Sequence, residues 1–198
     1  IEKTLDSVLS QTLKANEIIL IDDGSTDNSL DIINRFEERH SNIKVYTQVN
    51  SGPSMTRNIG AKLAKNNWIC FVDSDDILHP QRLEIASNFA DSCDVVICDF
   101  IRFKDNEILN FIEIDIRDIN SLNTFDSAKM VLKYGYGLPR MLMKKSVYES
   151  SGGLDVELVN NEDHELHFRM LTGNIIFKKI ITSLYFYRQH NSKSRLSN

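Results

Sequence analysis

Short apolar runs alternate with segments of helical periodicity in the first half of the chain. Four runs predict strands, and the segments between them carry apolar residues three and four positions apart, which predicts amphipathic helices. The predicted strands cover 18–21, 43–47, 68–72 and 94–98; helices are predicted from the first residue, over 28–40, after Gly52 and after Pro80. This alternation indicates an α/β fold with parallel strands and right-handed crossovers.

The pattern is less regular after residue 100. Helices are predicted over 125–134 and 163–172, and one or two strands over 175–187. Residues 101–123 suggest a strand pair or an excursion from the sheet. Because no linker or repeat interrupts the 198 residues, we predict a single domain, 1–198, with a regular half over about 1–100 and an irregular half over about 101–198.

Acidic residues directly follow two of the predicted strands. The run 68–72 ends in the segment 73–76 (Asp-Ser-Asp-Asp), and the run 18–21 ends in Asp22 and Asp23. Open α/β sheets bind ligands outside the carboxyl ends of their strands. Carboxylates gathered there suit hard divalent cations, although either stretch alone also fits a turn followed by a helix cap.

Three further polar residues are candidates for the same site. Asp163 stands between a Gly-Gly turn and a predicted helix, where a carboxylate could accept a proton from an attacking hydroxyl or simply stabilise the helix dipole. His190 follows the last predicted strand among polar and basic neighbours, and Arg57 lies in the helix before the second acidic strand end. An ordinary surface position is the alternative for both.

Composition and charge limit the class of protein. The chain is 41% hydrophobic and 26% charged, as in soluble proteins, and has no apolar run of the ~20 residues that a membrane span needs. Residues 1–165 hold 17 basic and 28 acidic residues, whereas residues 166–198 hold six basic and no acidic ones. The basic end suits an anionic ligand or a peripheral membrane contact, or is merely solvated. The acidic balance argues against nucleic-acid binding.

The three cysteines indicate a reducing compartment. Cys70, Cys93 and Cys98 have neither metal-ligand spacing nor a disulfide framework. We therefore predict free thiols and a cytoplasmic location, with the inner face of the membrane as the surface that the basic end could contact. No signal peptide is visible, and the chain opens within a predicted helix.

Five motifs, taken in order, resemble those of family 2 glycosyltransferases. They are Asp-Asp-Gly-Ser-Thr-Asp at 22–27, Gly-Pro-Ser-Met-Thr-Arg-Asn-Ile-Gly at 52–60, Phe-Val-Asp-Ser-Asp-Asp at 71–76, Glu-Asp at 162–163 and Arg-Gln-His-Asn-Ser at 188–192. The resemblance covers essentially the whole chain. It implies the GT-A fold, a Rossmann-like and mostly parallel sheet flanked by helices.

The resemblance also implies an activity. Such enzymes move a sugar, here a hexosyl or N-acetylhexosaminyl group, from a nucleotide-sugar donor to a hydroxyl acceptor with inversion of the anomeric centre. The expected donor is UDP-linked, and the expected acceptor is a saccharide or glycolipid in bacterial surface polysaccharide or glycolipid synthesis. By the same resemblance, Asp23 would hydrogen-bond the nucleobase and Asp73 would contact the ribose; Arg57 is predicted as a further nucleotide contact.

The remaining assignments concern the reaction itself. Asp75 would ligate a divalent metal, Mn²⁺ or Mg²⁺, on the donor diphosphate, and His190 would approach the metal or the diphosphate. Asp163 would be the general base. This division fits the chemistry, because a Lewis acid neutralises the departing phosphate and a carboxylate on the opposite face receives the acceptor proton.

Two features depart from the family pattern. The family's first strand, with its nucleotide-binding turn, is absent, so we expect the given sequence to begin after that strand. A sheet without a central strand would expose backbone groups and apolar faces. The segment 137–144, which we expect to face the acceptor, differs from many relatives, so the class of the acceptor is predicted but its identity is left open.

Two other functional classes remain open from the sequence. A nucleotidyltransferase also uses metal-bound carboxylates on an α/β sheet, but it would need a Gly-rich, basic phosphate loop near the N-terminus. A non-enzymatic, receiver-like module could use Asp22, Asp23 and Asp73 as a phosphoacceptor pocket. That alternative leaves the region from Asp163 to His190 without a role.

Overall fold

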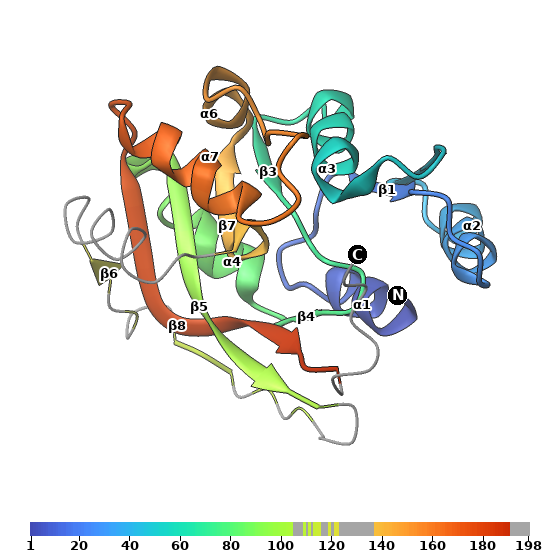
Figure 1. Cartoon of the computed structure of the whole chain (residues 1–198). Coiled ribbons are helices and arrows are strands. Elements are labelled where there is room, and N and C mark those ends of the chain that lie inside the picture. Colours follow the sequence, from blue (N-terminus) through green and yellow to red (C-terminus); the bar gives the residue numbers. More distant parts are fainter. Residues whose placement is uncertain are drawn as a thin grey trace.

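The computed structural model describes residues 1–104, 109, 111, 113–115, 119, 121–122 and 137–190. These residues form an α/β fold in which helices flank the sheets, as predicted (Figure 1). The elements are α1 (Glu2–Leu9), β1 (Ile18–Asp22), α2 (Ser29–Arg39), β2 (Ile43–Thr47), α3 (Gly52–Leu63), β3 (Trp68–Cys70), β4 (Ile77–Leu78), α4 (Arg82–Ser87), the 3₁₀ turn η1 (Ala90–Ser92), β5 (Val95–Phe103), β6 (Ser121–Leu122), the 3₁₀ turn η3 (Leu138–Arg140), β7 (Met141–Lys144), α6 (Lys145–Ser150), α7 (Glu162–Leu171) and β8 (Phe177–Arg188).

The strands form two sheets over the described residues. Parallel β1 and β2 make one, and the other has the order β3-β7-β5-β8-β4, with β6 also paired to β8. β5 and β8 are parallel, but β7 is antiparallel to both β3 and β5, and β4 and β6 are antiparallel to β8. The expectation of a mostly parallel sheet is thus corrected. Among the described strands, β4, β6 and β7 enter the larger sheet antiparallel to their neighbours, which requires no helical crossover, and the parallel pairs are β1 with β2 and β5 with β8.

Most predicted elements are present with shifted ends. The predicted strand 68–72 is shortened to β3, a separate short strand, β4, follows the acidic turn and was not predicted, and 175–187 forms the single strand β8. The strand predicted over 94–98 continues to Phe103 as β5. The helix predicted over 125–134 lies outside the described residues, as do 105–108, 110, 112, 116–118, 120 and 123 within the segment 101–123.

Side chains of β5 pack on both faces of the larger sheet. Val95 and Ile97 lie in one apolar cluster with Leu166 of α7, and Val96 lies in a second cluster with Ile85 of α4. Successive strand residues point to opposite faces, so this alternation places α7 and α4 on opposite sides of the sheet. The packing holds the first turn of α7 over one face.

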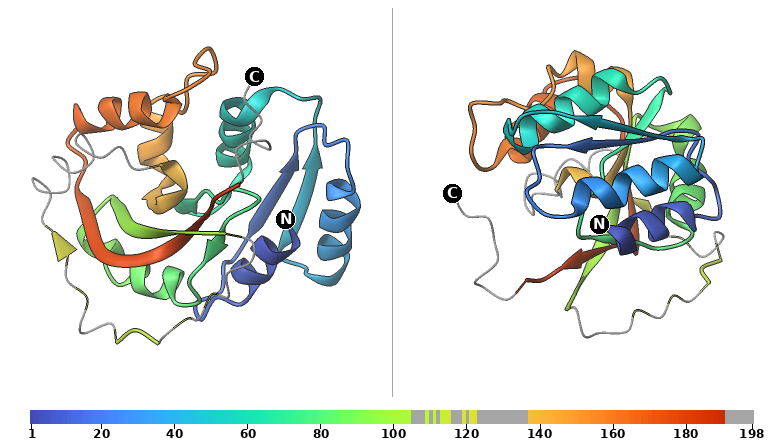
Figure 2. Two further views of the ribbon diagram at one scale, coloured as in Figure 1. Left: turned by 60° about the horizontal axis from the view of Figure 1, so that its bottom comes forward. Right: turned by 90° about the vertical axis from the view of Figure 1, so that its right-hand side faces the viewer.

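An apolar groove separates β1 from β3. It has a volume of about 490 Å³ and is lined from α1, β1, α3 and β3 by side chains that include Leu5, Ile19, Ala61 and Ile69. Figure 2 (left) shows β1, β2 and α2 on one side of this separation and the larger sheet on the other. Such a gap is what a sheet without a central strand would have.

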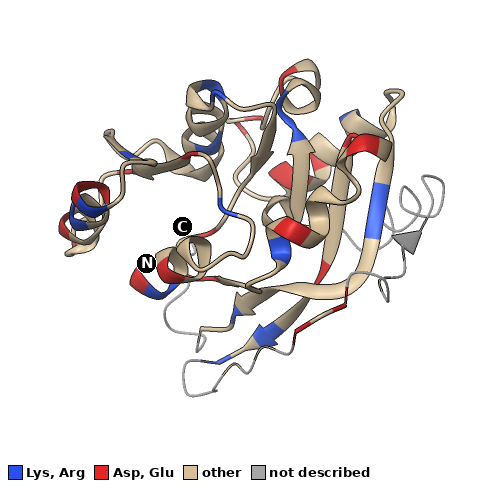
Figure 3. Ribbon diagram, turned by 180° about the vertical axis from the view of Figure 1, so that it is seen from behind, with Lys and Arg blue, Asp and Glu red and all other residues tan. Residues whose placement is uncertain are grey.

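Helix α2 covers the outer side of the smaller sheet. It buries Ile33, and its exposed face carries positive and negative positions interspersed (Figure 3). Amphipathic helices that lie on a sheet show this division. Of the helices described, none has both the length and the apolar character that crossing a membrane requires.

Candidate active site

Asp76 anchors the acidic turn that follows β3. Its side chain is fully buried, accepts a hydrogen bond from the Tyr185 hydroxyl, and accepts another from the Arg188 backbone N–H at 2.7 Å. Burial raises the pKa of Asp76 to about 6, helped by the nearby carboxylates of Asp75 and Asp73 and opposed by these two hydrogen bonds. Asp76 is therefore a structural residue that ties the turn to the end of β8.

This anchor brings the two predicted metal ligands together. Oδ2 of Asp75 lies 2.6 Å from Nε2 of His190, and the Arg188 side chain donates to the Asp75 carbonyl at 2.5 Å. Both side chains of the pair remain open, with exposed fractions of 43% for Asp75 and 31% for His190. The sequence prediction that they act at one place agrees with this contact.

The pair has the chemistry of a shared cation site. A carboxylate and an imidazole suit Mn²⁺, and a carboxylate suits Mg²⁺, which keeps several waters and uses substrate phosphates as further ligands. Within the described part of the chain, no group of three or more His, Cys, Asp or Glu side chains could hold a metal alone. Asp75 and His190 therefore fit a cation that a bound diphosphate helps to coordinate.

Arg57 spans two acidic segments. Its Nη2 donates to Asp73 Oδ1 at 2.8 Å, and its Nη1 donates to Glu162 Oε1 at 3.3 Å. Burial lowers the pKa of Arg57, but the carboxylates of Asp73, Asp163 and Glu162 raise it above the usual value. The guanidinium is thus a fixed positive charge between the acidic turn and the start of α7. Its predicted nucleotide contact stays a prediction.

Asp23 caps the helix that carries Arg57. Its carboxylate accepts hydrogen bonds from Ser51 N at 2.8 Å, Gly52 N at 2.9 Å and Gln48 Nε2 at 2.7 Å. Burial raises the pKa of Asp23, but these donors outweigh it and hold the pKa below its usual value. The Thr56 hydroxyl also lowers the pKa of Asp23, so the carboxylate is held by several groups around the start of α3. A nucleobase N–H is the predicted further partner. That predicted contact is untested.

Asp163 lies in the first turn of α7. Asn161, just before the helix, has a φ of +62°, a left-handed conformation that asparagine tolerates. Oδ2 of Asp163 accepts a hydrogen bond from Leu138 N at 3.1 Å, and Oδ1 has no hydrogen-bond partner among the described residues. Three acids, Glu162, Asp163 and Glu165, stabilise the positive end of the helix dipole. One oxygen of Asp163 thus remains for a ligand.

Residues of helix α3 contact several parts of the candidate site. Its first residue, Gly52, binds Asp23, and one turn later Arg57 reaches Asp73 and Glu162. The structure therefore gathers the two acidic strand ends and the start of α7 around one helix. Sequence reasoning missed Glu162 as a partner of Arg57, and it missed Tyr185 as a partner of Asp76. Sequence periodicity shows only that Tyr185 lies in a strand, so no local signal identifies that contact.

Comparisons with known proteins identify the family of the chain. The family model described as "Glycosyl transferase family 2" matches residues 1–181. "Uncharacterized glycosyltransferase YibD" of Escherichia coli (strain K12) is 38% identical over 96 residues, which cover 48% of this chain and 28% of that protein. "Poly(ribitol-phosphate) beta-glucosyltransferase" of Bacillus spizizenii is 44% identical over 94 residues, 46% of this chain and 15% of that protein. The matches therefore span under a third of these relatives.

Solved structures share the fold over nearly the whole chain. Staphylococcus aureus TarS 1-349 in complex with UDP has a TM-score of 0.75 and 23% identity, and the match covers 96% of this chain and 56% of that one. The complex of the same protein with UDP-GlcNAc has a TM-score of 0.75 and 21% identity, with 96% and 55% covered. The predicted α/β fold of GT-A type is confirmed by this likeness.

Proposed function

Because the chain belongs to glycosyl transferase family 2, we propose that it transfers a sugar from a UDP-linked donor to a hydroxyl acceptor with inversion. The observation that carries the proposal is the position of Arg57. One guanidinium contacts Asp73, in the acidic turn assigned to the donor, and Glu162, the neighbour of the candidate base Asp163. Arg57 thus keeps the carboxylates assigned to the donor and to the acceptor close together. A one-step displacement requires this, because donor and acceptor must be bound side by side.

The proposed donor site lies along the acidic strand ends. Asp23, directly after β1, would meet the nucleobase, and Asp73 Oδ2 remains for the ribose while Oδ1 is held by Arg57. The TarS complexes with UDP and UDP-GlcNAc support a uridine diphosphate sugar as the donor class. The match to the glycosyl transferase family 2 model over residues 1–181 makes a nucleotidyltransferase the weaker candidate.

Asp75 and His190 would hold a divalent cation, Mn²⁺ or Mg²⁺, beside the donor diphosphate. When bound, such a cation neutralises the charge that develops on the departing phosphate. The protein's own part is to keep the two ligands in place. Asp76 does this by receiving hydrogen bonds from Tyr185 and from the Arg188 backbone, which fix the acidic turn against β8.

Asp163 would remove the proton from the acceptor hydroxyl. The Leu138 N–H holds Oδ2, so the orientation of the carboxylate is set and Oδ1 is left to receive the proton. The hydroxyl oxygen then forms the new bond to the anomeric carbon as the bond to the diphosphate breaks. Attack from the face opposite the leaving group inverts that carbon, and no covalent protein intermediate is needed.

The acceptor and the location of the enzyme are parts of the same proposal. The likeness to a poly(ribitol-phosphate) beta-glucosyltransferase supports a bacterial surface polysaccharide or glycolipid as the acceptor class. Cys70, Cys93 and Cys98 are free thiols, which suits the cytoplasm. Lys193 and Arg195, part of the proposed membrane contact, lie outside the described residues.

A panel of nucleotide sugars tests the function. We expect calorimetry with Mn²⁺ to show binding of a UDP-sugar, and an acceptor mixture to release UDP. Asp163→Asn should leave donor binding intact and lower transfer by about 10²- to 10⁴-fold, the usual contribution of a general base. Asp155→Asn, an exposed acid of the same loop, is the matched control and should keep full transfer. Pyrophosphate release from a nucleoside triphosphate, with no binding of any nucleotide sugar, would contradict the proposal.

A further inference from the structure

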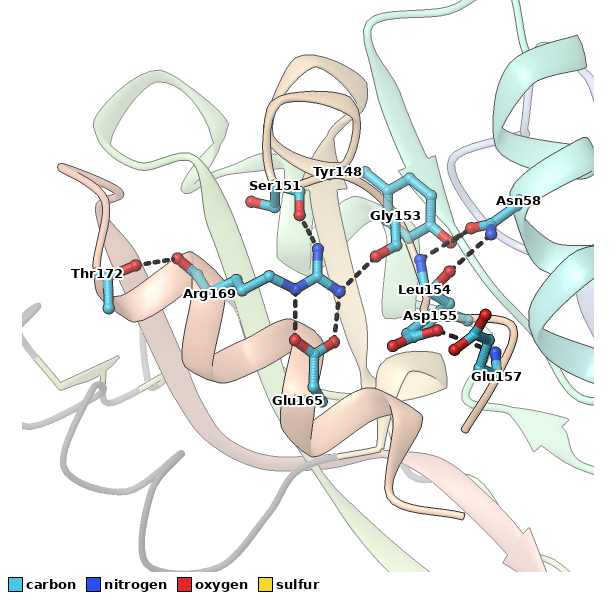
Figure 4. Close-up of polar contacts among 10 residues, drawn as sticks. All are labelled: Asn58, Tyr148, Ser151, Gly153, Leu154, Asp155, Glu157, Glu165, Arg169 and Thr172. Atoms are coloured by element: carbon cyan, nitrogen blue, oxygen red, sulfur yellow. Dashed lines mark hydrogen bonds and ion pairs between the residues drawn. The ribbon is translucent and has the colours of Figure 1, made fainter. Parts of the chain in front are cut away.

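The Gly-Gly turn after α6 is held by side chains from two helices (Figure 4). From α3, Asn58 Nδ2 donates to the Leu154 carbonyl at 2.8 Å, and Asn58 Oδ1 accepts from Leu154 N at 2.9 Å. From α7, Arg169 Nη2 donates to the Gly153 carbonyl at 2.6 Å, and Nη1 donates to the Ser151 carbonyl. We call the contacts of Asn58 with Leu154 and of Arg169 with Gly153 and Ser151 the turn clamp.

Gly152 and Gly153 allow the side chains of the turn clamp to approach the backbone closely. Gly152 has a φ of +86° and Gly153 a φ of +68°, the left-handed region that other residues rarely adopt. A Cβ on Gly153 would lie 2.7 Å from Asn58 Oδ1, and a Cβ on Gly152 would lie 3.0 Å from Arg169 Nη1. Both side chains therefore approach the turn more closely than any larger residue would permit.

Each clamping side chain is itself held in place. Glu165, one turn before Arg169 on α7, binds the guanidinium with both oxygens, at 2.7 Å to Nε and 2.5 Å to Nη2. Such a two-point contact fixes the plane of the guanidinium. Asn58 Oδ1 also accepts from the Tyr148 hydroxyl at 2.6 Å. The clamp thus presents donors and acceptors in fixed positions.

The clamp joins the two helices that carry the candidate site. Asn58 follows Arg57 on α3, and Arg169 stands on α7, whose first turn holds Asp163. The contact between Arg57 and Glu162 joins the same two helices at a second place. Two separate connections restrict both the distance between the helices and their relative rotation.

We infer that Asn58 and Arg169 are positioning residues, which set the place of Asp163 relative to Asp73 by clamping the turn between α3 and α7. This inference rests on the proposed function, because it treats Asp163 as the base. A displacement of ~1 Å in such a group can cost about 10²-fold in rate. The clamp would therefore act on the chemical step and not on donor binding.

Hydrogen exchange on the unliganded protein tests the clamp without any activity. In Asn58→Ala we expect exchange over residues 155–165 to rise about tenfold, while exchange in α4 stays as in the original chain. Tyr148→Phe is the control, because it removes one hydrogen bond to Asn58 and leaves both contacts with Leu154. Unchanged exchange over 155–165 in Asn58→Ala, or an equal rise in Tyr148→Phe, would overturn the inference.

Kinetics separate positioning from a general loss of structure. With a UDP-sugar and Mn²⁺, Asn58→Ala and Arg169→Lys should keep the donor Kd within about twofold and lower kcat per UDP-binding site by about 10- to 100-fold. Asn58→Asp keeps an acceptor for Leu154 N but turns a carboxylate oxygen toward the Leu154 carbonyl, so it should lower kcat per site at least as much as Asn58→Ala. Fewer UDP-binding sites with an unchanged kcat per site would mean a purely structural role and refute the inference. If the original chain binds no nucleotide sugar, the proposed function fails, and the exchange result alone decides on the clamp.

Discussion

Oδ2 of Asp75 and Nε2 of His190 lie 2.6 Å apart, although 115 positions separate the two residues in the chain. The pairing of Asp76 with Tyr185 and Arg188 brings the end of β8 against the acidic turn and so creates this contact. The fold, and not local sequence, therefore assembles the candidate cation site.

Replacement of Asp75 should weaken the response to Mn²⁺. A neutral amide is a poorer ligand than a carboxylate, so we expect Asp75→Asn to raise the Mn²⁺ concentration for half-maximal transfer by about tenfold or more. His190→Gln should produce a smaller shift, because water can replace a neutral ligand. Titration of transfer with Mn²⁺ after chelation measures both. Asp91→Asn, at an exposed acid of η1, is the control, and an unshifted Asp75→Asn curve would contradict the assignment.

The contact between Arg57 and Glu162 should appear as an energetic coupling. Arg57→Met and Glu162→Gln each remove one side of the contact, and neighbouring charged residues typically couple by ~0.5–3 kcal/mol. Urea unfolding of both single variants and the double variant gives the coupling free energy. Strictly additive effects would show that the 3.3 Å contact contributes nothing to stability.

Protonation of Asp76 should stabilise the fold. Its pKa is about 6 in the folded chain, above the usual 3.8, so the native state binds the proton more tightly. This contribution is complete below pH 3.8, is lost as the pH rises through about 6, and is on the order of 3 kcal/mol. Asp76→Asn cannot titrate, so its stability relative to the original chain should increase over this range. Urea midpoints measured across the range test this, and parallel stability curves would contradict it.

The titration of His167 should change the stability of the fold with pH in the direction opposite to that of Asp76. Burial lowers its pKa to about 4, although the charge of Asp163 opposes this shift. Its stabilisation is present above pH 6.5 and is lost as the pH falls through about 4, because the unfolded chain binds the proton first. We expect His167→Leu to gain on the order of 2 kcal/mol relative to the original chain near about pH 5.

The environment of His167 adds a second expectation. Both ring nitrogens are buried without a hydrogen-bond partner among the described residues, which costs free energy even when the ring is neutral. His167→Leu should therefore be at least as stable as the original chain near neutral pH as well. Denaturant unfolding at two pH values measures both effects, and a destabilised variant at either pH would show that the imidazole makes a favourable contact.

The acidic site was predictable because its signals are local. Each strand ends where apolar residues give way to aspartates, and this holds for Asp23 and for the segment 73–76 without knowledge of the fold. The order of the five motifs then identified the family that the comparisons show. Asp163 and His190 were placed by that order and not by any pattern of their own.

The acidic pattern alone does not distinguish Asp75 from Asp76, and only the family resemblance assigned the metal to Asp75. Both belong to one acidic stretch, yet Asp76 is buried against Tyr185, 109 positions away, and Asp75 is open. That difference depends on which part of β8 reaches the turn. The antiparallel entry of β7 between β3 and β5 is a similar case, because strand order is decided by contacts between distant segments.

The groove between β1 and β3 has a consequence for how the protein responds to its donor. Among the described strands, β1 is hydrogen-bonded only to β2, so Asp23 stands at the end of a two-stranded sheet that is not hydrogen-bonded to the larger one. Segments with few backbone connections open at a lower free energy than the core does. Binding of the nucleobase should then suppress these openings. The loss of conformational entropy offsets part of the binding free energy, so the donor affinity depends on how ordered β1 is in the unliganded protein.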